Sequence, residues 1–294
     1  MCAIAYRSAT PADVPALAEL FITAVGDLGR RTGQSGMPTE PRREEPGYRH
    51  VLATGIFRLA EADGVPVGMA CAIVRHDLWF LSGYWVHPEW QNQGIGGPLL
   101  RQVWATGEAA GCRTFSVWAS SDPTALAMYM KLGMLPGYEV LSFAADAGAL
   151  QLPPAGATLR PAGAEDLPLL GAIDAEIRAT PRLEDHRWLL GRPDAACWLL
   201  ERGGEPMAYA YTSGGRVGPA AWTDPRQAEE LLVLALQQAA SGGARVMLSV
   251  PGPNHSVLRL ALAAGLRLRS HAHFLSTRPL GRPEQYLPQG PLLY

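Results

Sequence analysis

The chain has 294 residues, of which 48% are hydrophobic and 18% are charged, and its formal net charge is -2. This length exceeds what one small hydrophobic core usually organises, so two domains of roughly 150 residues each are expected. The balanced charge provides no strongly basic surface, which argues against a nucleic-acid partner.

The start of the chain and its cysteines limit where the protein works. No basic start is followed by an apolar run, and no stretch approaches about 18 uninterrupted apolar residues. We therefore expect a cytoplasmic protein with no membrane partner. Cys2, Cys71, Cys112 and Cys197 are far apart and form no CxxC pair, which predicts reduced thiols, no disulfide framework and no metal site.

In chain order, the first half predicts a helix, a β-meander, a loop that opens a second helix, a strand, a third helix and a closing strand. Residues 29–47 are polar, with Gly, Pro and mixed charges, which suits either a variable substrate-binding segment or a solvated, mobile loop. Residues 79–86, WFLSGYWV, form a compact apolar run that predicts a buried strand, which His87 and Pro88 end. The order of elements indicates an α/β layer fold.

A glycine-rich loop follows that strand. In residues 91–97, QNQGIGG, the glycines let the backbone turn tightly and bring several N–H groups near an anion. Pro98 suits the first position of a helix whose apolar face includes Leu99 and Val103 and which Gly111 can end. Unpaired N–H groups and the helix dipole favour a phosphate at such a helix start, so the loop predicts a pyrophosphate site that needs no lysine.

The chain contains an ordered internal repeat. Residues at the start of each half recur with the same spacing: Arg7, Ala9, Asp13, Pro15 and Leu17 against Arg160, Ala162, Asp166, Pro168 and Leu170. Residues 59–71 resemble 199–211, and residues 116–134 resemble 248–266, with helix starts at Asp122 and Asn254 and helix stops at Gly133 and Gly265. Residues 151–158 have the composition of a linker. Duplication is therefore expected, with domains at 1–150 and 156–294.

The loop and a later helix resemble the GNAT superfamily of N-acetyltransferases. The family pattern Q/R-x-x-G-x-G/A is matched by residues 91–96, after a strand ending in Val86, His87 and Pro88. A second family pattern, A-x-x-x-Y-x-x-x-G, is matched by Ala125, Tyr129 and Gly133. Ala125 and Tyr129 share a helix face, so a thin cofactor arm could pass the alanine and reach the phenol.

The resemblance implies two tandem GNAT-like domains, each a mixed, mostly antiparallel twisted sheet flanked by helices, with acetyl-CoA as cosubstrate and no metal. It implies direct attack of an amine on the thioester, with a backbone N–H near Val86 holding the oxyanion and Tyr129 as general acid to the CoA thiolate. The residues expected to bind the cofactor are Trp85, Val86, Gln91, Asn92, Gln93, Gly94, Ile95, Gly96, Gly97, Asp122 and Ala125.

The resemblance leaves the general base open. Many family members have a glutamate on the strand before the loop, but residues 79–86 contain no carboxylate. His76 and Asp77 precede the strand and are candidates to act through water, or form an ordinary solvated turn. Nearby tryptophans are candidates to line an acceptor pocket or to pack in the core, namely Trp79, Trp85, Trp90 and Trp118.

The second copy departs from the pattern where chemistry is expected. Residues 215–232 contain no Q-x-x-G-x-G, and Ala261 stands where the first copy has Tyr129. We therefore expect the second domain to be a structural or substrate-shaping lobe without catalysis.

The expected function is transfer of an acetyl group from acetyl-CoA to a primary amine of a small molecule. The missing base keeps a non-catalytic acyl-CoA-binding or sensing protein as the alternative, and a longer acyl or succinyl donor stays open. The sequence does not choose the acceptor, nor between a monomer and a homodimer.

Overall fold

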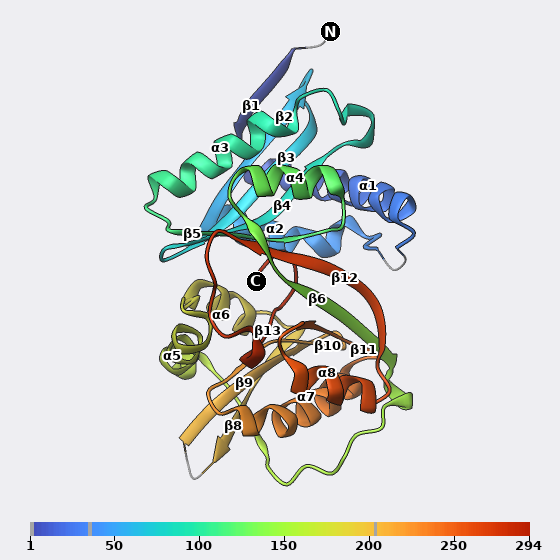
Figure 1. Cartoon of the computed structure of the whole chain (residues 1–294), viewed down its shortest axis with the longest axis vertical. Helices are drawn as coiled ribbons and strands as arrows, with labels where there is room; N and C mark the ends of the chain where they lie inside the picture. The colour runs from blue at the N-terminus through green and yellow to red at the C-terminus, as the bar shows by residue number, and fades with distance from the viewer. Residues whose placement is uncertain (1–2, 35–36, 203–204) are drawn as a thin grey trace. The chain divides into compact units, whose positions relative to one another are not determined.

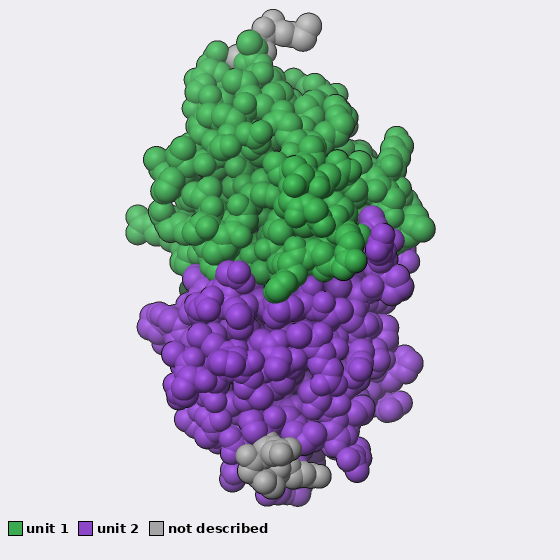
Figure 2. Space-filling view, turned by 90° about the vertical axis from the view of Figure 1, so that its left-hand side faces the viewer, with its two compact units in different colours: residues 1–135 green, residues 136–294 purple. Residues whose placement is uncertain are grey.

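The computed structural model describes residues 3–34, 37–202 and 205–294, and the chain forms two compact units, Met1–Leu135 and Pro136–Tyr294 (Figure 2). This division falls before the linker-like residues 151–158, because the strand Leu135–Asp146 makes its contacts in the second unit. Within the described residues, no helix is long and apolar enough to cross a membrane. Cys71, Cys112 and Cys197 are buried free thiols, and Cys2 lies outside the described residues.

The first unit is a sheet with helices on both faces (Figure 1). Its strands lie in the order β1 (Ile4–Ser8), β2 (Gly55–Ala62), β3 (Val65–Arg75), β4 (Leu78–Val86) and β5 (Thr114–Ala119). Neighbouring strands are antiparallel except β4 and β5, which are parallel. The helices are α1 (Val14–Thr32), α2 (Pro41–Thr54), α3 (Gly96–Ala109) and α4 (Pro123–Lys131).

The side chains of β2 point alternately to the two faces of the sheet, and those on each face contact helices. Phe57 packs against Tyr48 of α2, with ring centroids 5.7 Å apart. Ala60 points to the opposite face and belongs to a cluster with Ile95, and a Cβ at Gly68 would lie 3.6 Å from both Ala60 and Leu99 of α3. Successive side chains of a strand alternate between faces, so one strand serves two helix layers.

Residues 29–32 and 41–47 of the polar segment are helical, which corrects the expectation of a loop there, although most described residues of the segment are exposed. Helix α1 continues to Thr32 and ends at Gly33, whose φ of 68° suits glycine. Helix α2 begins at Pro41. Tyr48 and Val51 are buried on one face of α2, and burial of that face stabilises a helix that its polar composition alone does not predict.

The second unit contains a sheet in the order β12 (Arg267–Ser276), β6 (Leu135–Asp146), β11 (Arg245–Pro251), β10 (Arg216–Trp222), β9 (Glu205–Ser213), β8 (Ala195–Arg202) and β7 (Leu159–Pro161). The short strand β13 (Tyr286–Leu287) pairs with β10. The helices are α5 (Leu167–Arg178), α6 (Leu183–Leu190), α7 (Ala228–Gly242) and α8 (His255–Ala263). Leu231, Leu236 and Ala239 of α7 lie in the hydrophobic core of this unit, as the sequence predicts for residues 228–240.

The two units repeat one ion-pair network. Arg7 binds Asp13 at 2.7 Å and Glu61 at 2.9 Å. Arg160 binds Asp166 at 2.9 Å and Glu201 at 2.7 Å. In both units the arginine fixes the first strand against the start of the first helix and against the second strand. This confirms the repeat that the spacing of these residues predicts.

Helix ends also repeat as predicted. The Asp122 carboxylate accepts hydrogen bonds from the N–H groups of Thr124 and Ala125, and the Asn254 side chain accepts one from Val257 N. Gly133 and Gly265 follow α4 and α8 with φ of 87° and 86°. These left-handed positions end both helices at equivalent places.

Candidate functional site

The glycine-rich loop lies between β4 and α3. A short 3-10 turn, η2 (Pro88–Trp90), follows Val86, and Asn92 and Gly94 then adopt φ of 61° and 80°. Helix α3 begins at Gly96, so Pro98 stands at its third position and not at the first as predicted. Gly96 and Gly97 therefore lie in the first turn, where backbone N–H groups have no partner within the helix.

Two amide side chains of the loop hold its shape by hydrogen bonds to nearby backbone carbonyl groups. Gln91 Nε2 donates to Val86 O at 3.1 Å, and Gln93 Nε2 donates to Glu89 O at 2.8 Å. Ile95 is buried, and its carbonyl accepts a hydrogen bond from Tyr6 Oη at 3.2 Å. Asn92 and Gly94 are exposed. The loop is thus anchored at Gln91, Gln93 and Ile95, while its tip stays open to solvent.

Gly96 makes the closest approach in the loop. A Cβ at Gly96 would lie 2.2 Å from Tyr84 Oη, so no other residue fits there without displacing Tyr84. A Cβ at Gly97 would lie 3.3 Å from a terminal nitrogen of Arg101, which places this cation beside the helix start. Burial raises the pKa of Tyr84 to about 12.

Sequence reasoning missed Tyr84 and Arg101. The available signal was their position: Tyr84 lies on β4 close to its end, and Arg101 follows Gly97 by one helical turn on the same face. A cation at the start of a helix opposes the helix dipole, which is itself a reason to look for an anion there.

Strand β4 has a free edge near its end. It pairs with β3 as far as Val86, but within the described residues its pairing with β5 covers only Leu78–Leu81. His87 N donates to Val67 O at 2.9 Å, and alternation along an antiparallel ladder then turns the N–H groups of Val86 and Tyr84 toward the β5 side. The same alternation turns the N–H of Trp85 toward β3.

Tyr129 meets this part of β4 from helix α4. Its ring centroid lies 6.3 Å from that of Tyr84, and Tyr84 Oη lies 3.7 Å from Sδ of Met128. Tyr129 is buried, and burial raises its pKa well above the ordinary value, so the phenol is protonated at neutral pH. Ala125 is half-buried one turn earlier. The two sequence motifs therefore come together around Tyr84.

Asp122 has an evident structural role beside this site. Its carboxylate caps α4 and also binds Arg31 of α1 at 3.2 Å. Its predicted contact with the cofactor would add to this role.

His76 and Asp77 are not near the end of β4, which removes them as candidate bases. They form the turn before β4, where Asp77 binds Arg113 at 2.7 Å. Val86 follows Leu78 by eight residue steps along the strand, roughly 26 Å at about 3.3 Å per step. A single water cannot span that distance.

The tryptophans divide between core and site. Trp79 is fully buried and packs against Trp104 and Phe115, and Trp90 packs against the cluster around Ile95. Trp85 is half-buried and lies edge-on to Phe21 of α1, with ring centroids 5.2 Å apart. Of these residues, Trp85 best fits a place near the acceptor.

The corresponding part of the second unit is filled by the chain itself. Strands β10 and β11 are parallel at Arg216 and Val217, and beyond that point β13 pairs with Ala220 and Ala221. Gln285 Nε2 donates to the carbonyls of Trp222 and Thr223 at 2.9 and 3.1 Å. Asn254, the counterpart of Asp122, donates through Nδ2 to Tyr286 O at 3.4 Å.

A buried polar network occupies the helix side of the second unit. When the two copies are aligned so that Arg160 matches Arg7, Asp174 corresponds to Phe21 of the first copy. The Asp174 carboxylate accepts hydrogen bonds from Arg182 at 2.7 Å and from Tyr209. His186 Nε2 lies 3.0 Å from the same carboxylate. Burial alone would raise the pKa of Asp174, but the Arg182 guanidinium and His186 lower it. The carboxylate is therefore an ionised partner of Arg182.

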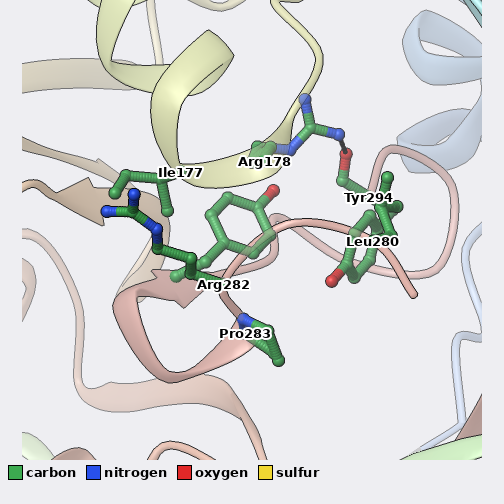
Figure 3. A pocket seen from close by; sticks show the side chains of 7 residues that line it. Ile177, Arg178, Leu280, Arg282, Pro283 and Tyr294 are labelled. Carbon is green, nitrogen blue, oxygen red and sulfur yellow. Dashed lines mark hydrogen bonds between the residues drawn. The ribbon is translucent and has the colours of Figure 1, made fainter.

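Nearby, the segment after Leu280 closes against α5 (Figure 3). Arg178 donates to the backbone oxygen of Tyr294 at 2.6 Å, and its guanidinium lies over the rings of Tyr286 and Tyr294. Ala261 is buried at the place of Tyr129. These contacts leave the second unit without the free strand edge and the phenol that the first unit has.

Comparisons with known proteins agree with this geometry. Residues 27–134 match the Acetyltransferase (GNAT) family. An aminoglycoside N(6')-acetyltransferase type 1 of Stenotrophomonas maltophilia is 34% identical over 116 residues, which are 36% of this chain and 69% of that protein.

Two solved structures resemble the whole chain in fold. A Pyrococcus horikoshii protein assigned as an acetyltransferase has a TM-score of 0.77 at 19% identity, over 99% of this chain and 92% of its own. A tandem GNAT protein from the clavulanic acid biosynthesis pathway has a TM-score of 0.62 at 14% identity, over 94% of this chain and 99% of its own. The expectation of two tandem GNAT-like domains is thereby confirmed.

The matched relatives and the fold define an acetyl-CoA-dependent N-acetyltransferase. The chain belongs to the acetyltransferase (GNAT) family. The family uses acetyl-CoA as cosubstrate, and the residues of the first unit suit such a ligand, because glycines 94, 96 and 97 add no side chain of their own at the loop and the start of α3.

Proposed function

We propose that the first unit transfers the acetyl group of acetyl-CoA to a primary amine of a small molecule, by direct attack within a ternary complex. The observation that carries this proposal is the convergence on Tyr84, whose hydroxyl approaches Gly96 of the loop and whose ring faces Tyr129. A phosphate-binding loop and a protonated phenol at one strand end suit a substrate that carries a pyrophosphate and a thioester.

In this proposal the pyrophosphate binds at the start of α3. The N–H groups of Gly96 and Gly97 and the positive end of the helix dipole attract it, and Arg101 adds a full positive charge. Gln91, Asn92, Gln93, Gly94 and Ile95 give the loop its shape. The arm that follows the phosphates runs along the free edge of β4 and passes Ala125.

The chemical step uses groups at the end of β4. A neutral amine attacks the thioester carbonyl, and the N–H of Val86 donates to the oxyanion that forms. As the C–S bond breaks, Tyr129 donates its phenolic proton to the departing thiolate, and the proton that the nitrogen loses as the amide forms restores the phenol directly or through solvent. Burial raises the pKa of the phenol, so Tyr129 is protonated at neutral pH and has a proton to donate. The removal of the ammonium proton is left without an assigned side chain.

For the acceptor we propose an amino sugar that presents a primary amine. The support is the name of the Stenotrophomonas relative, an aminoglycoside N(6')-acetyltransferase that is 34% identical over 116 residues. Phe21 and Trp85 are half-buried aromatic rings between α1 and the end of β4, and their apolar faces suit the carbon face of a sugar ring.

The test is a panel of amines, beginning with aminoglycosides that carry a 6'-amine, with acetyl-CoA as donor and release of free CoA thiol as the readout. We expect thiol release that depends on the amine, together with an acetylated product seen by mass spectrometry. Acetyl-CoA binding with no acceptor consumed across the panel would favour the acyl-CoA-binding or sensing alternative. Faster turnover with a succinyl or longer acyl donor would correct the donor.

A further inference from the structure

A carboxylate and two imidazoles converge on neighbouring strands of the second unit, away from the features described above. His271 Nδ1 lies 2.8 Å from one carboxylate oxygen of Glu139, and His273 Nδ1 lies 2.7 Å from the other. One ligand atom from each residue lies within 4.8 Å of the others. Of the residues that the structure describes, only these three form a group with metal-ligand convergence.

Backbone geometry brings the three side chains together. His271 and His273 are two residues apart on β12, so both point to the same face of the sheet. Glu139 lies on β6, the neighbour of β12 in the sheet, and reaches both imidazoles from across the strand boundary.

The strand that carries Glu139 is held on its other side. Glu139 O accepts a hydrogen bond from Gly252 N at 2.7 Å, and β6 pairs with β11 from Val140 onward. The three donors therefore project from paired backbone and need only side-chain rotation to close around an ion. Positioning of this kind reduces the entropy that ligands lose on binding.

The donor set selects the class of metal. Two imidazole nitrogens and one carboxylate oxygen suit zinc and neighbouring transition metals, whereas magnesium and calcium prefer oxygen ligands alone. The side chains of His271, Glu139 and His273 are 53%, 43% and 24% exposed, so water reaches the cluster and can complete the coordination. Three protein ligands with water at the remaining position are typical of an open zinc site.

We propose that Glu139, His271 and His273 form a binding site for a divalent transition metal of the zinc class, which bridges β6 and β12. The sequence-based expectation of no metal rested on the scattered cysteines and did not consider the H-x-H pair at residues 271–273. The bound ion replaces the imidazole–carboxylate hydrogen bonds with metal–ligand bonds and stabilises the second unit.

The test uses the full chain, freed of metal by chelation and then titrated with Zn²⁺ by calorimetry and with Co²⁺ by visible absorption at neutral pH. We expect one ion per chain at this site and the absorption bands of a four- or five-coordinate Co²⁺ ion. His271→Ala and His273→Ala should each weaken Zn²⁺ binding at least tenfold, and the double variant should abolish it. Saturating Zn²⁺ should raise the thermal unfolding temperature of the wild type but not that of the double variant.

His255→Ala is the matched control, because His255 is an exposed histidine at the start of α8 outside the cluster. It should bind Zn²⁺ as the wild type does. Glu139→Gln keeps the size of the side chain and should weaken binding without unfolding the unit. An absence of Zn²⁺ binding by the wild type, or binding that persists in the His271→Ala/His273→Ala double variant, overturns the proposal.

Discussion

Strand β4 of the first unit and strand β10 of the second each start with a parallel pairing, to β5 and β11 respectively, but the later parts of the two strands differ. Beyond Leu81, β4 leaves its edge toward β5 unpaired among the described residues, and glycines follow at the start of α3. Beyond Val217, β10 is paired by β13, and the turn before α7 has Asp224, Pro225 and Arg226 in place of glycines. The second unit thus differs from the first in two features of the expected ligand site: its loop has no glycines, and its strand edge is covered by its own chain.

The first helix of each copy, α1 or α5, also has different surroundings in the two units. Phe21 in the first unit contacts Tyr48 and Trp85 through aromatic rings. At the equivalent place the second unit buries Asp174 with Arg182 and His186. Removing one partner of a buried ion pair leaves the other charge buried without a partner, which destabilises the fold. Single substitutions in this network are therefore expected to be poorly tolerated.

Loss of the Tyr129 hydroxyl is the change expected to have the largest effect. Tyr129→Phe removes the proposed acid and keeps the ring, so kcat should fall by about 10²-fold or more. The Kd for acetyl-CoA should stay near the wild-type value because the loop is unchanged. Steady-state kinetics and calorimetry measure the two quantities.

The control for this variant is Tyr138→Phe, which removes a half-buried phenol of the second unit that bonds to Tyr294. Its kcat should be that of the wild type. An equal fall in both variants would take the acid role away from Tyr129.

The strand β13 is expected to contribute mainly stability. Leu287 is fully buried in the core of the second unit, so Leu287→Ala should lower the free energy of unfolding by about 2–4 kcal/mol. Urea-induced unfolding measures the change, and Leu268→Ala, at a residue that is 53% exposed, is the control with little expected loss. If Leu287→Ala costs no more than Leu268→Ala, β13 does not fill the edge of β10 as described.

Arg101 should affect binding more than turnover. Arg101→Gln removes the cation beside Gly97, and the Kd for acetyl-CoA should rise by about tenfold, since one charge-assisted hydrogen bond is worth about 1.5–3 kcal/mol and solvent screens part of it. The effect should shrink as salt is raised. Arg113→Gln, at the other end of β4, should leave Kd unchanged. Equal effects of the two variants would indicate general electrostatic attraction.

The repeated ion pairs should have small and equal effects. Asp13→Asn and Asp166→Asn should each lower the free energy of unfolding by about 0.5–1 kcal/mol at pH 7, because the partner arginines are partly exposed. Hydrogen bonds from Arg7 and Arg160 lower the pKa of the two carboxyls. Their contribution is therefore present above the unfolded pKa of about 3.9 and is lost as the pH falls through the lower folded pKa.

Urea unfolding at pH 7 and near pH 2 checks this prediction. The difference between each variant and the wild type should shrink at the acidic pH. A loss in one unit without a matching loss in the other would show that the two networks, although alike in geometry, contribute unequally to stability.

Much of the fold and of the site could be predicted from the sequence because the relevant signals are local. The strand before the loop, the helix caps at Asp122 and Asn254, and the glycine stops are set by neighbouring residues. The same holds for the repeat, which Arg7 and Arg160 confirm with equivalent partners.

The missed features depend on contacts distant in sequence. Nothing near Tyr84 announces that its hydroxyl lies against Gly96, and the pairing of β13 with β10 joins residues far apart in the chain. Helix α2 was missed because tertiary burial of Tyr48 and Val51 outweighs a polar composition. The role of Tyr129 and the cofactor contacts stay predictions until a ligand is bound.

The central claim, that the chain has one acetyl-CoA site and that it lies at the loop of the first unit, is tested most directly by a calorimetric titration of the full chain. We predict one acetyl-CoA per chain for the wild type and none for Gly94→Asp, because residue 94 needs φ of 80° and a carboxylate there repels phosphate. Arg226→Ala, in the corresponding turn of the second unit, should bind as the wild type does. Two molecules of acetyl-CoA per chain, or one that still binds to Gly94→Asp, would contradict the account.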